Sequence, residues 1–261
     1  MASVLLSSMQ PSPSSQSDPS AQPHQARVLI TVATYNELEN LPDLLEAIFA
    51  EVPRVDVLVI DDNSPDGTGR WCDERAAGDP RVHCLHRSGK LGLGTATIAG
   101  MRHAIEHGYD YVLNLDADFS HHPRYIPALL AAMDHCDVAI GSRYVAGGGV
   151  KDWPWRRRFM SWGVNTYARL LLGLKPRDCS GAYRCFRVAL LERLDFNAII
   201  SRGYSFQEEI LWRLKRLGAK FHEVRILFAD RERGVSKING REAVNALWII
   251  FRLGLKNWLG I

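Results

Sequence analysis

The stretch LNLDADFSHHP, residues 113–123, decides the fold. Residues 109–115 predict an apolar strand, which ends abruptly in Asp116 and Asp118. Alternation along a strand would put both carboxylates on one face. Mg²⁺ and Mn²⁺ prefer oxygen ligands, usually one or two carboxylates together with substrate phosphates. The pair is therefore a candidate metal site, and a polar strand exit with Asx-turn bonding is the alternative.

Strands and helices alternate on both sides of this stretch. Apolar, β-branched runs predict further strands at residues 28–33, 55–60, 82–85 and 138–141. Helices are predicted over residues 41–52, after the turn at 64–67, and over 95–107 and 123–133. This order predicts an α/β fold with a doubly wound, mostly parallel sheet. Ligands of such sheets gather beyond the carboxyl ends of the strands.

Polar residues follow four of these strands. They are Thr34-Tyr35-Asn36-Glu37, Asp61-Asp62, Asp116-Ala117-Asp118 and Ser142-Arg143. A carboxylate beyond a strand can bind ribose or base, and a tyrosine ring can stack on a base. The alternative is helix capping by Asn36, Glu37 or Asp62. Their occurrence at successive strand ends favours a nucleotide. Residues 91–95 lack the later glycine of GxGxxG and the lysine of a P-loop, which argues against a dinucleotide fold or a P-loop kinase.

The second part of the chain has a different composition. Residues 1–150 carry 10 basic and 19 acidic residues, a net charge of −9, whereas residues 151–261 carry 22 and 10, a net charge of +12. A basic region suggests contact with phosphate, a lipid surface or nucleic acid. Further helices are expected at 155–172, 205–217 and 241–259, and strands at 179–187 and 220–228. We expect a disordered tail at 1–25, a catalytic domain at 26–240 and a C-terminal amphipathic helix at 241–261.

The sequence gives no sign of export or of a membrane span. No apolar run reaches the ~18–20 residues needed to cross a bilayer, and the N-terminus does not have the pattern of a secretory leader. The five cysteines are scattered without a CxxC pair, which favours a reducing, cytosolic setting. His121 and His122 are adjacent and are poor candidates to chelate one zinc ion together.

Several ordered segments resemble the family 2 glycosyltransferases, and within them the dolichol-phosphate (polyprenol-phosphate) mannosyltransferases. The resemblance covers residues from about 27 to 240 and rests on segments 32–37, 59–68, 89–96, 116–123, 141–144, 147–150 and 203–209 and on Arg231 and Lys237. Two positions depart from the family pattern. Ala33 replaces a usual proline, and Ser120 stands where some relatives have a glutamine that binds the metal.

The resemblance implies a GT-A fold, a GDP-mannose donor, a dolichyl or polyprenyl phosphate acceptor, and Mg²⁺ or Mn²⁺. By motif, the guanosine site would be formed by Ala33, Tyr35, Glu37, Ile60 and Asp62. Asp116, Ala117 and Asp118 would contact ribose, diphosphate and metal, with Ser120 as a further metal ligand. The acceptor phosphate would be bound by Arg143, Arg157 and Ser161. Arg231 and Lys237 would close over the donor diphosphate and, with Asp118 and Arg143, carry the catalysis.

A phosphate acceptor needs no general base, because its second pKa is about 6 and it is largely a dianion at neutral pH. Catalysis would then be positioning and electrostatics, with in-line attack and inversion at the anomeric carbon. The lipid acceptor implies a protein peripheral to the cytosolic face of a membrane. Two basic amphipathic segments, 153–174 and 241–261, could lie on that surface, and a small integral-membrane subunit could also attach the protein.

Three other functions fit parts of the sequence. The same fold could use another nucleotide sugar, such as UDP-glucose. The chain could be a non-catalytic nucleotide-sugar-binding subunit, although the expected carboxylates and arginines are present. A nucleic-acid-binding protein is suggested only by the basic part, and the acidic part argues against it. We therefore expect no nucleic-acid partner.

Overall fold

The predicted mostly parallel α/β sheet is confirmed in the computed structural model, which describes residues 26–229 and 240–260. Seven strands lie in the order β3-β2-β1-β4-β7-β5-β8. Their bounds are β1 Val28–Thr34, β2 Asp56–Asp61, β3 Val82–His86, β4 Tyr111–Asp116, β5 Val138–Ser142, β7 Arg184–Arg187 and β8 Phe221–Arg225. Only β7 runs antiparallel to its neighbours, β4 and β5. The predicted tail at 1–25, Arg231 and Lys237 lie outside the described residues.

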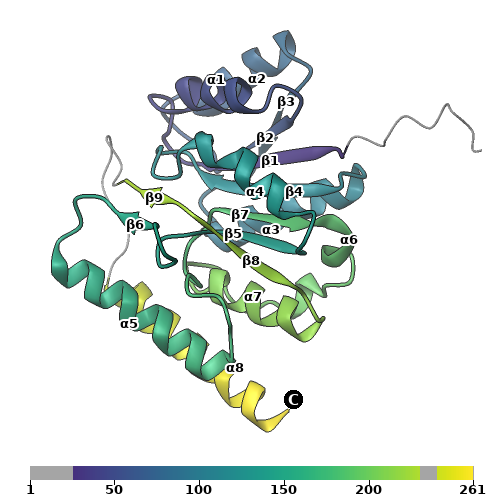
Figure 1. Cartoon of the computed structure of the whole chain (residues 1–261). Helices are drawn as coiled ribbons and strands as arrows, with labels where there is room; N and C mark the ends of the chain where they lie inside the picture. The colour runs from purple at the N-terminus through teal and green to yellow at the C-terminus, as the bar shows by residue number, and fades with distance from the viewer. Residues whose placement is uncertain (1–25, 230–239, 261) are drawn as a thin grey trace, which may run out of the picture.

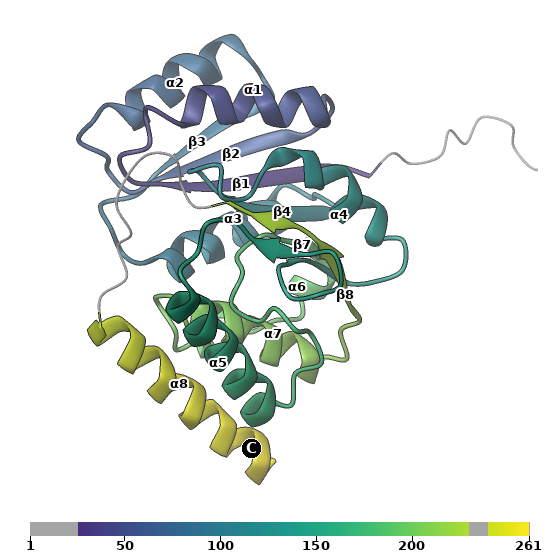
Figure 2. The same cartoon turned by 60° about the vertical axis from the view of Figure 1, so that its left-hand side comes forward.

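Helices cover both faces of the sheet (Figures 1 and 2). One apolar core contains side chains from α1 (Leu41–Glu51), α2 (Thr68–Gly78) and α4 (Ile126–Ala132). The other contains side chains from α3 (Leu93–Glu106), α6 (Val188–Leu191) and α7 (Phe206–Arg216). Two 3₁₀ turns, Pro123–Tyr125 and Phe196–Ala198, complete the connections. This is the doubly wound arrangement that the alternating sequence pattern predicts.

Helix α1 shows how the apolar pattern sets this packing. Leu41, Leu44, Leu45 and Ile48 recur at helical spacing and are completely buried against the sheet. On the opposite face, α3 approaches β1 so closely that a Cβ atom at Gly100 would lie 2.8 Å from Cγ2 of Thr31. A glycine at this position therefore allows the helix to lie directly on the strand that leads to the site.

Two long helices, α5 (Trp155–Leu172) and α8 (Gly240–Leu259), pack side by side at one end of the molecule (Figure 2). Tyr167 donates to the carbonyl of Leu247, and Trp258 donates to the carbonyl of Leu171, so the helices run in the same direction. The bounds of α5 agree with the sequence prediction. The domain division remains a prediction, although α8 places Ile250 and Leu253 in the same core as α3 and α7.

Two predicted strands are shorter than expected. Of residues 179–187, only the last four form β7, because residues 176–183 build a polar loop. The run at 220–228 is divided into β8 and β9 (Leu227–Phe228). Strand β9 pairs with β6 (Gly149–Val150) in a small second sheet that the sequence analysis did not predict. None of the helices in residues 26–229 and 240–260 is long and apolar enough to cross a membrane.

Candidate active site

The carboxyl ends of three neighbouring strands bring the predicted nucleotide residues into one row. Ala33 at the end of β1 pairs with Ile60 on β2 and with Asp116 on β4. In the next row Thr34 pairs with Asp61. The sheet therefore places side chains from three separate segments at the edge where ligands of parallel sheets bind. We call this row and the loops that follow it the acidic edge.

The loops after β1 and β2 are joined by hydrogen bonds. The amide of Asn36 donates to the hydroxyl of Ser64 at 3.0 Å, and the amide of Leu38 donates to Asp66 at 3.1 Å. Asp61 accepts from the hydroxyl of Thr34 at 3.1 Å and from the amide of Ser64. Asp61 thus organises the loops, and its hydrogen bonds with protein groups leave it less suited to bind a ligand.

Asp62 lies at the same edge in a different environment. Its Oδ1 lies 2.9 Å from Nη1 of Arg87, which is also largely buried. Burial raises the pKa of Asp62, although Arg87 opposes that shift. Helix α2 begins after Gly67, so the alternative that Asp62 caps this helix is wrong. Arg87 therefore holds Asp62 in place at this edge.

The other predicted guanosine residues lie in the loop after β1. The amide of Glu37 donates to the hydroxyl of Thr68, and its carboxylate accepts from the side chain of Asn40 at 3.0 Å. The cap of α1 is Asn40, without a side-chain capping bond, so neither Asn36 nor Glu37 is the N-cap residue. Lys90 lies 5.1 Å from the centre of the Tyr35 ring. This places a cation from the glycine-containing loop above the predicted base-stacking ring.

The predicted metal residues turn out of β4 immediately after the acidic row. Asp118 is 8% exposed, and its Oδ1 accepts from the amide and the hydroxyl of Ser120 at 3.1 and 2.6 Å. Phe119, between them, has a φ of 59°, the left-handed turn that brings Ser120 back onto Asp118. The Asp116 side chain is 34% exposed. In this arrangement Ser120 orients Asp118, and oxygen atoms alone form the expected ligand set.

His121 and His122 have separate roles. His121 is buried behind Asp116, with Nδ1 3.3 Å from Oδ2 of that residue, and burial lowers its pKa to about 4. Its ring packs against Tyr183 at 5.0 Å between centres. His122 instead accepts from the amide of Arg124 and caps the turn that follows. The two rings therefore do not share a metal.

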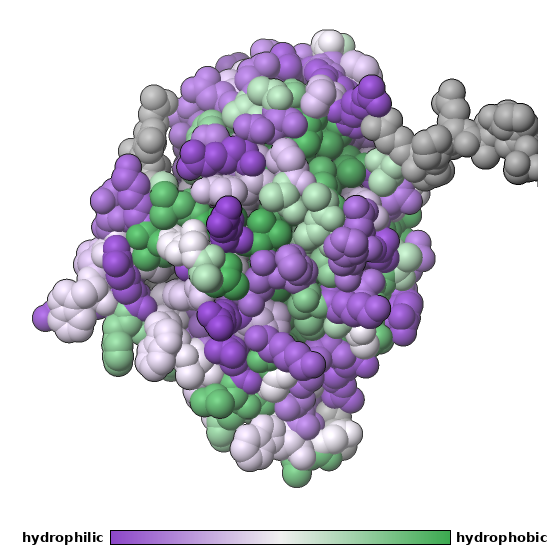
Figure 3. All heavy atoms as spheres, viewed as in Figure 1, coloured by the Kyte–Doolittle hydropathy of each residue, from purple (hydrophilic) through white to green (hydrophobic). Residues whose placement is uncertain are grey.

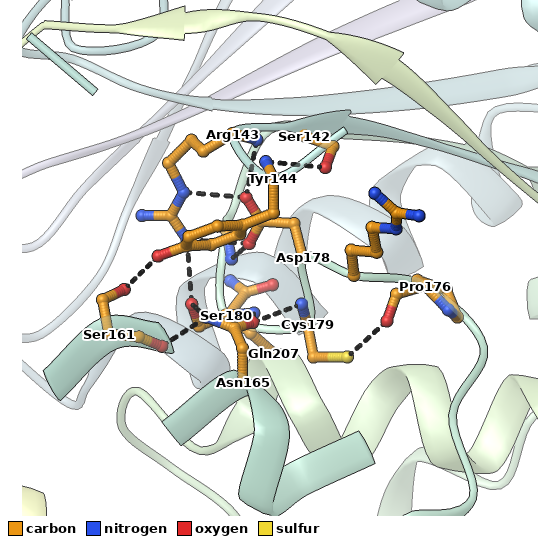
Figure 4. A network of polar contacts seen from close by, with 12 residues as sticks. Ser142, Arg143, Tyr144, Ser161, Asn165, Pro176, Asp178, Cys179, Ser180 and Gln207 are labelled. Carbon is orange, nitrogen blue, oxygen red and sulfur yellow. Dashed lines mark hydrogen bonds and ion pairs between the residues drawn. The ribbon is translucent and has the colours of Figure 1, made fainter. Parts of the chain in front are cut away.

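Arg143 follows β5 and is bound by a loop residue that the sequence analysis did not single out (Figure 4). Its Nε and Nη2 donate to the two carboxylate oxygens of Asp178, each at 2.7 Å, and its amide donates to Oδ2 at 3.0 Å. Asp178 is completely buried. Burial alone would raise the pKa of Asp178, but the charge of Arg143 outweighs it and the pKa is lowered. Burial would lower the pKa of Arg143, but the negative charge of Asp178 outweighs burial and raises it.

A polar network extends from this pair to the start of α5. Ser180 accepts from Arg143 at 2.8 Å and from Asn165 at 3.1 Å. The side-chain oxygen of Asn165 accepts from the amides of Cys179 and Ser180. Ser161, predicted at the acceptor phosphate, accepts from the hydroxyl of Tyr144 at 2.6 Å. Figure 4 shows that these side chains converge from α5, the loop before β7 and the end of β5.

Arg157 and Arg143 both lie against the indole ring of Trp153. The guanidinium carbon of Arg157 lies 3.9 Å from the centre of the Trp153 ring, and that of Arg143 lies 5.7 Å from the same centre. We call these two residues the arginine pair. Arg158 points elsewhere, because it donates to the carbonyls of Trp153 and Val150. These two hydrogen bonds tie the exposed Arg158 side chain to the loop before α5.

Two buried ionisable residues near the arginine pair were also missed. Arg184 on β7 is completely buried and donates to the carbonyls of Gln207 and Cys179. Glu208 on α7 is 3% exposed, and burial raises its pKa to about 7. Glu208 lies within segment 203–209 of the family resemblance and Arg184 within the strand predicted at 179–187, but neither signal predicts that these charges are buried together. Predicted Arg231 and Lys237 cannot be placed, since they lie outside the described residues.

The fold is that of a GT-A glycosyltransferase. Residues 29–195 match the family described as Glycosyl transferase family 2, and the chain belongs to that family.

Two curated relatives are similar to this chain over most of its length. The chain is 47% identical to the undecaprenyl-phosphate mannosyltransferase of Micrococcus luteus, covering 90% of this chain and 97% of the relative. It is 44% identical to the polyprenol monophosphomannose synthase of Mycolicibacterium smegmatis, covering 93% and 92%.

The structural likeness is broader. Glucosyl-3-phosphoglycerate synthase from Mycobacterium tuberculosis, solved with Mn²⁺, UDP and glucosyl-3-phosphoglycerate, has a TM-score of 0.61 at 18% identity, covering 90% of this chain and 81% of that one. S. aureus TarS 1–349, solved with UDP-GlcNAc, has a TM-score of 0.57 at 17% identity, covering 88% and 67%. At these identities the two structures support the fold alone.

Proposed function

We propose that this chain transfers mannose from GDP-mannose to dolichyl or polyprenyl phosphate. The observation that carries the proposal is that Arg143, after β5, lies close enough to Asp116 on β4 for the carboxylate charge to act on the guanidinium. This position of the arginine pair beside the acidic edge suits an anionic acceptor opposite a nucleotide-sugar donor. The names of the two curated relatives, an undecaprenyl-phosphate mannosyltransferase and a polyprenol monophosphomannose synthase, agree with mannose transfer to a polyprenyl phosphate.

In this proposal the donor lies along the acidic edge. Ala33, Tyr35, Glu37, Ile60 and Asp62 bind guanosine, and Asp116, Ala117 and Asp118 meet ribose and diphosphate. The oxygen-only donor set of Asp116 and Asp118 fits Mg²⁺ or Mn²⁺, and one solved GT-A structure contains Mn²⁺. A bound divalent ion supplies positive charge to the leaving diphosphate. Ser120 serves by orienting Asp118 through the 2.6 Å hydrogen bond, or as a ligand if its hydroxyl turns away.

The acceptor phosphate is bound by the arginine pair and Ser161. Nε and Nη2 of Arg143 are bound to Asp178, so this guanidinium would meet the phosphate through Nη1. Together with Arg157 it offsets the repulsion between two anionic substrates. An oxygen of the acceptor phosphate attacks the anomeric carbon of mannose, and the bond from that carbon to GDP breaks with inversion. The dianionic acceptor needs no proton removed. Arg231 and Lys237 complete the proposed donor site.

The α5–α8 face suits the surface of the membrane that carries the acceptor. About half of the aromatic residues of these helices were expected from the sequence to fill the core, which is wrong. All five are exposed: Trp155, Trp162, Trp248, Phe251 and Trp258. Exposed apolar side chains also include Phe159, Met160, Leu170, Val244, Leu255 and Leu259. Green and pale spheres gather over this end of the molecule in Figure 3. Apolar and aromatic residues beside arginines are typical of helices that lie in a membrane interface.

The proposal is tested by incubating the purified chain with labelled GDP-mannose, polyprenyl phosphate and Mg²⁺ or Mn²⁺. We expect labelled lipid extracted into organic solvent, and none when the acceptor phosphate is replaced by the free polyprenol. UDP-glucose in place of GDP-mannose tests the other donor. The assay is repeated with cell membranes, which could supply a small integral-membrane subunit. If the chain binds GDP-mannose but transfers no mannose under either condition, the proposal is overturned.

A further inference from the structure

A second group of metal-binding side chains lies outside the proposed active site, where β3 forms the edge of the sheet. Asp73 on α2 and Cys84 and His86 on β3 each offer one ligand atom, and these three atoms lie within 4.8 Å of one another. Cys84 and His86 are two residues apart on a strand, so they project from the same face. Cys84 packs with the core that contains α2, which places both residues beneath that helix.

We propose that Asp73, Cys84 and His86 form a binding site for a thiophilic divalent cation, and that Zn²⁺ is the ion that fits it best. Zinc is bound in proteins by cysteine sulfur, histidine nitrogen and carboxylate oxygen. Mg²⁺ takes oxygen ligands almost exclusively. A donor set of one sulfur, one nitrogen and one oxygen therefore selects a softer ion than the Asp116–Asp118 pair does.

The surrounding residues hold the three ligands in place. Nε2 of His86 lies 2.8 Å from Oδ1 of Asp73, so the nitrogen and the carboxylate already point toward one another. The imidazole ring lies against the backbone of α2 at Gly69, where an added Cβ atom would stand 3.1 Å from its Cε1. The thiol of Cys72 interacts with that of Cys84 from the buried side. These contacts supply the support that metal ligands require from their neighbours.

The site is accessible to an ion. Asp73 and Cys84 line an open hollow of 560 Å³, and His86 lines a second hollow of 370 Å³ beside Asp61 and Gly69. Three protein ligands leave a fourth position of a tetrahedral ion for water. An ion here joins α2 to the edge strand, and the inference is independent of the substrate assignment because none of the three residues belongs to the proposed active site.

The direct test is zinc binding by the full chain without substrates. The protein is stripped with a chelator and titrated with Zn²⁺ against a chromophoric competitor, in excess Mg²⁺. We expect one tight zinc ion per chain, and affinity at least about tenfold weaker in Cys84→Ser and in His86→Gln, the lower limit seen even for outer-shell changes. His83→Gln is the matched control because His83 neighbours Cys84 but projects from the other face. Asp118→Asn should also keep the zinc ion.

A second measurement uses the unaltered protein and does not depend on the folding of a variant. Alkylation of cysteines is followed by peptide mass spectrometry with and without Zn²⁺ in excess Mg²⁺. We expect zinc to slow the alkylation of Cys84 and to leave that of Cys136 unchanged. Equal zinc affinity in Cys84→Ser and the unaltered chain, or Cys84 alkylation that does not respond to zinc, would overturn the proposal.

Discussion

The guanidinium of Arg143 is held by both carboxylate oxygens of Asp178, at 2.7 Å each. The two residues are 35 positions apart in the chain and meet at the edge where β5 ends and the loop before β7 passes. Because the carboxylate occupies Nε and Nη2, Arg143 has one fixed orientation before any substrate arrives. Preorganised charge of this kind stabilises a reacting anion without a reorganisation cost at the moment of reaction.

Arg143→Lys should weaken the acceptor interaction more than the donor interaction. Lysine keeps the charge opposite Asp178 but loses the planar fork. Hydrogen bonds to charged groups contribute about 1.5–3 kcal/mol each, so we expect the half-saturating concentration of polyprenyl phosphate to rise about tenfold or more. Steady-state kinetics with each substrate varied in turn provide the measurement. Arg102→Lys, on the surface beside Phe196, is the control, and a change confined to GDP-mannose would contradict the assignment.

Asp178→Asn should destabilise the fold in a way that depends on pH. Removing one partner of a buried ion pair costs about 3–5 kcal/mol. The pKa of Asp178 is lowered in the folded state from 3.8, so its stabilising contribution is complete above that value and is lost as the pH falls through the folded pKa. Urea unfolding at several pH values should show a constant deficit near neutrality that shrinks in acid. A deficit independent of pH would argue against the ion pair.

Glu208→Gln should have the opposite pH dependence. The Glu208 pKa is raised by burial from 4.5 to about 7, so the folded protein keeps a proton that the unfolded chain releases. Stability is therefore greatest below 4.5 and falls as the pH rises toward 7. The glutamine variant lacks this loss, and its stability relative to the unaltered chain should increase between pH 5 and 8 by up to about 3 kcal/mol. Unfolding free energies measured at both pH values test this.

Substitutions of Ser120 test whether this residue orients Asp118 or binds the metal directly. If Ser120 chiefly orients Asp118, Ser120→Ala should reduce the activity without abolishing it, whereas Asp118→Asn should abolish turnover. Ser120→Gln introduces the glutamine that some relatives have at this position, and we expect it to lower the Mn²⁺ concentration needed for half-maximal transfer. Metal titrations of the transfer rate provide the measurement. Complete inactivity of Ser120→Ala would favour direct ligation.

The exposed tryptophans of α5 and α8 should determine membrane binding. Trp155 and Trp248 are 72% and 62% exposed, so replacing both with alanine removes interfacial contacts with little loss of packing. We expect reduced sedimentation with anionic liposomes and slower transfer to acceptor in liposomes, but near-normal transfer to acceptor in detergent. Replacing exposed Ile200 with serine is a control, because that residue lies outside α5 and α8. Unchanged liposome binding would contradict the proposed orientation.

The sequence predicted the elements whose signal is local. Apolar spacing identified α5 with its bounds, and the polar ends of β1, β2 and β4 identified the acidic edge. In the structure, the pairing of β1 with β2 and β4 then aligns Ala33, Ile60 and Asp116. The helix and the polar strand ends could be predicted because each depends on the spacing of residues within one segment of the sequence.

The residues around Arg143 were harder to predict because their partners are distant in the chain. Asp178, Asn165 and Glu208 acquire their roles only when the loop before β7, α5 and α7 meet. In the sequence, residues 179–187 were predicted as one strand, which concealed the loop at its start. The aromatic residues of α8 posed the reverse difficulty, since a core helix and an interfacial helix contain the same residue types.

The reversed direction of β7 has a consequence for how the protein tolerates changes of length. Strand β7 enters the sheet at the edge where its neighbours leave it, so the segment preceding it is anchored by the sheet on one side and by α5 on the other. One residue inserted between Asp178 and Arg184 would shift the carboxylate out of register with Arg143. An insertion at the opposite end of β7 would lie far from the chemistry. Natural length variation should accordingly be rare before this strand and common after it.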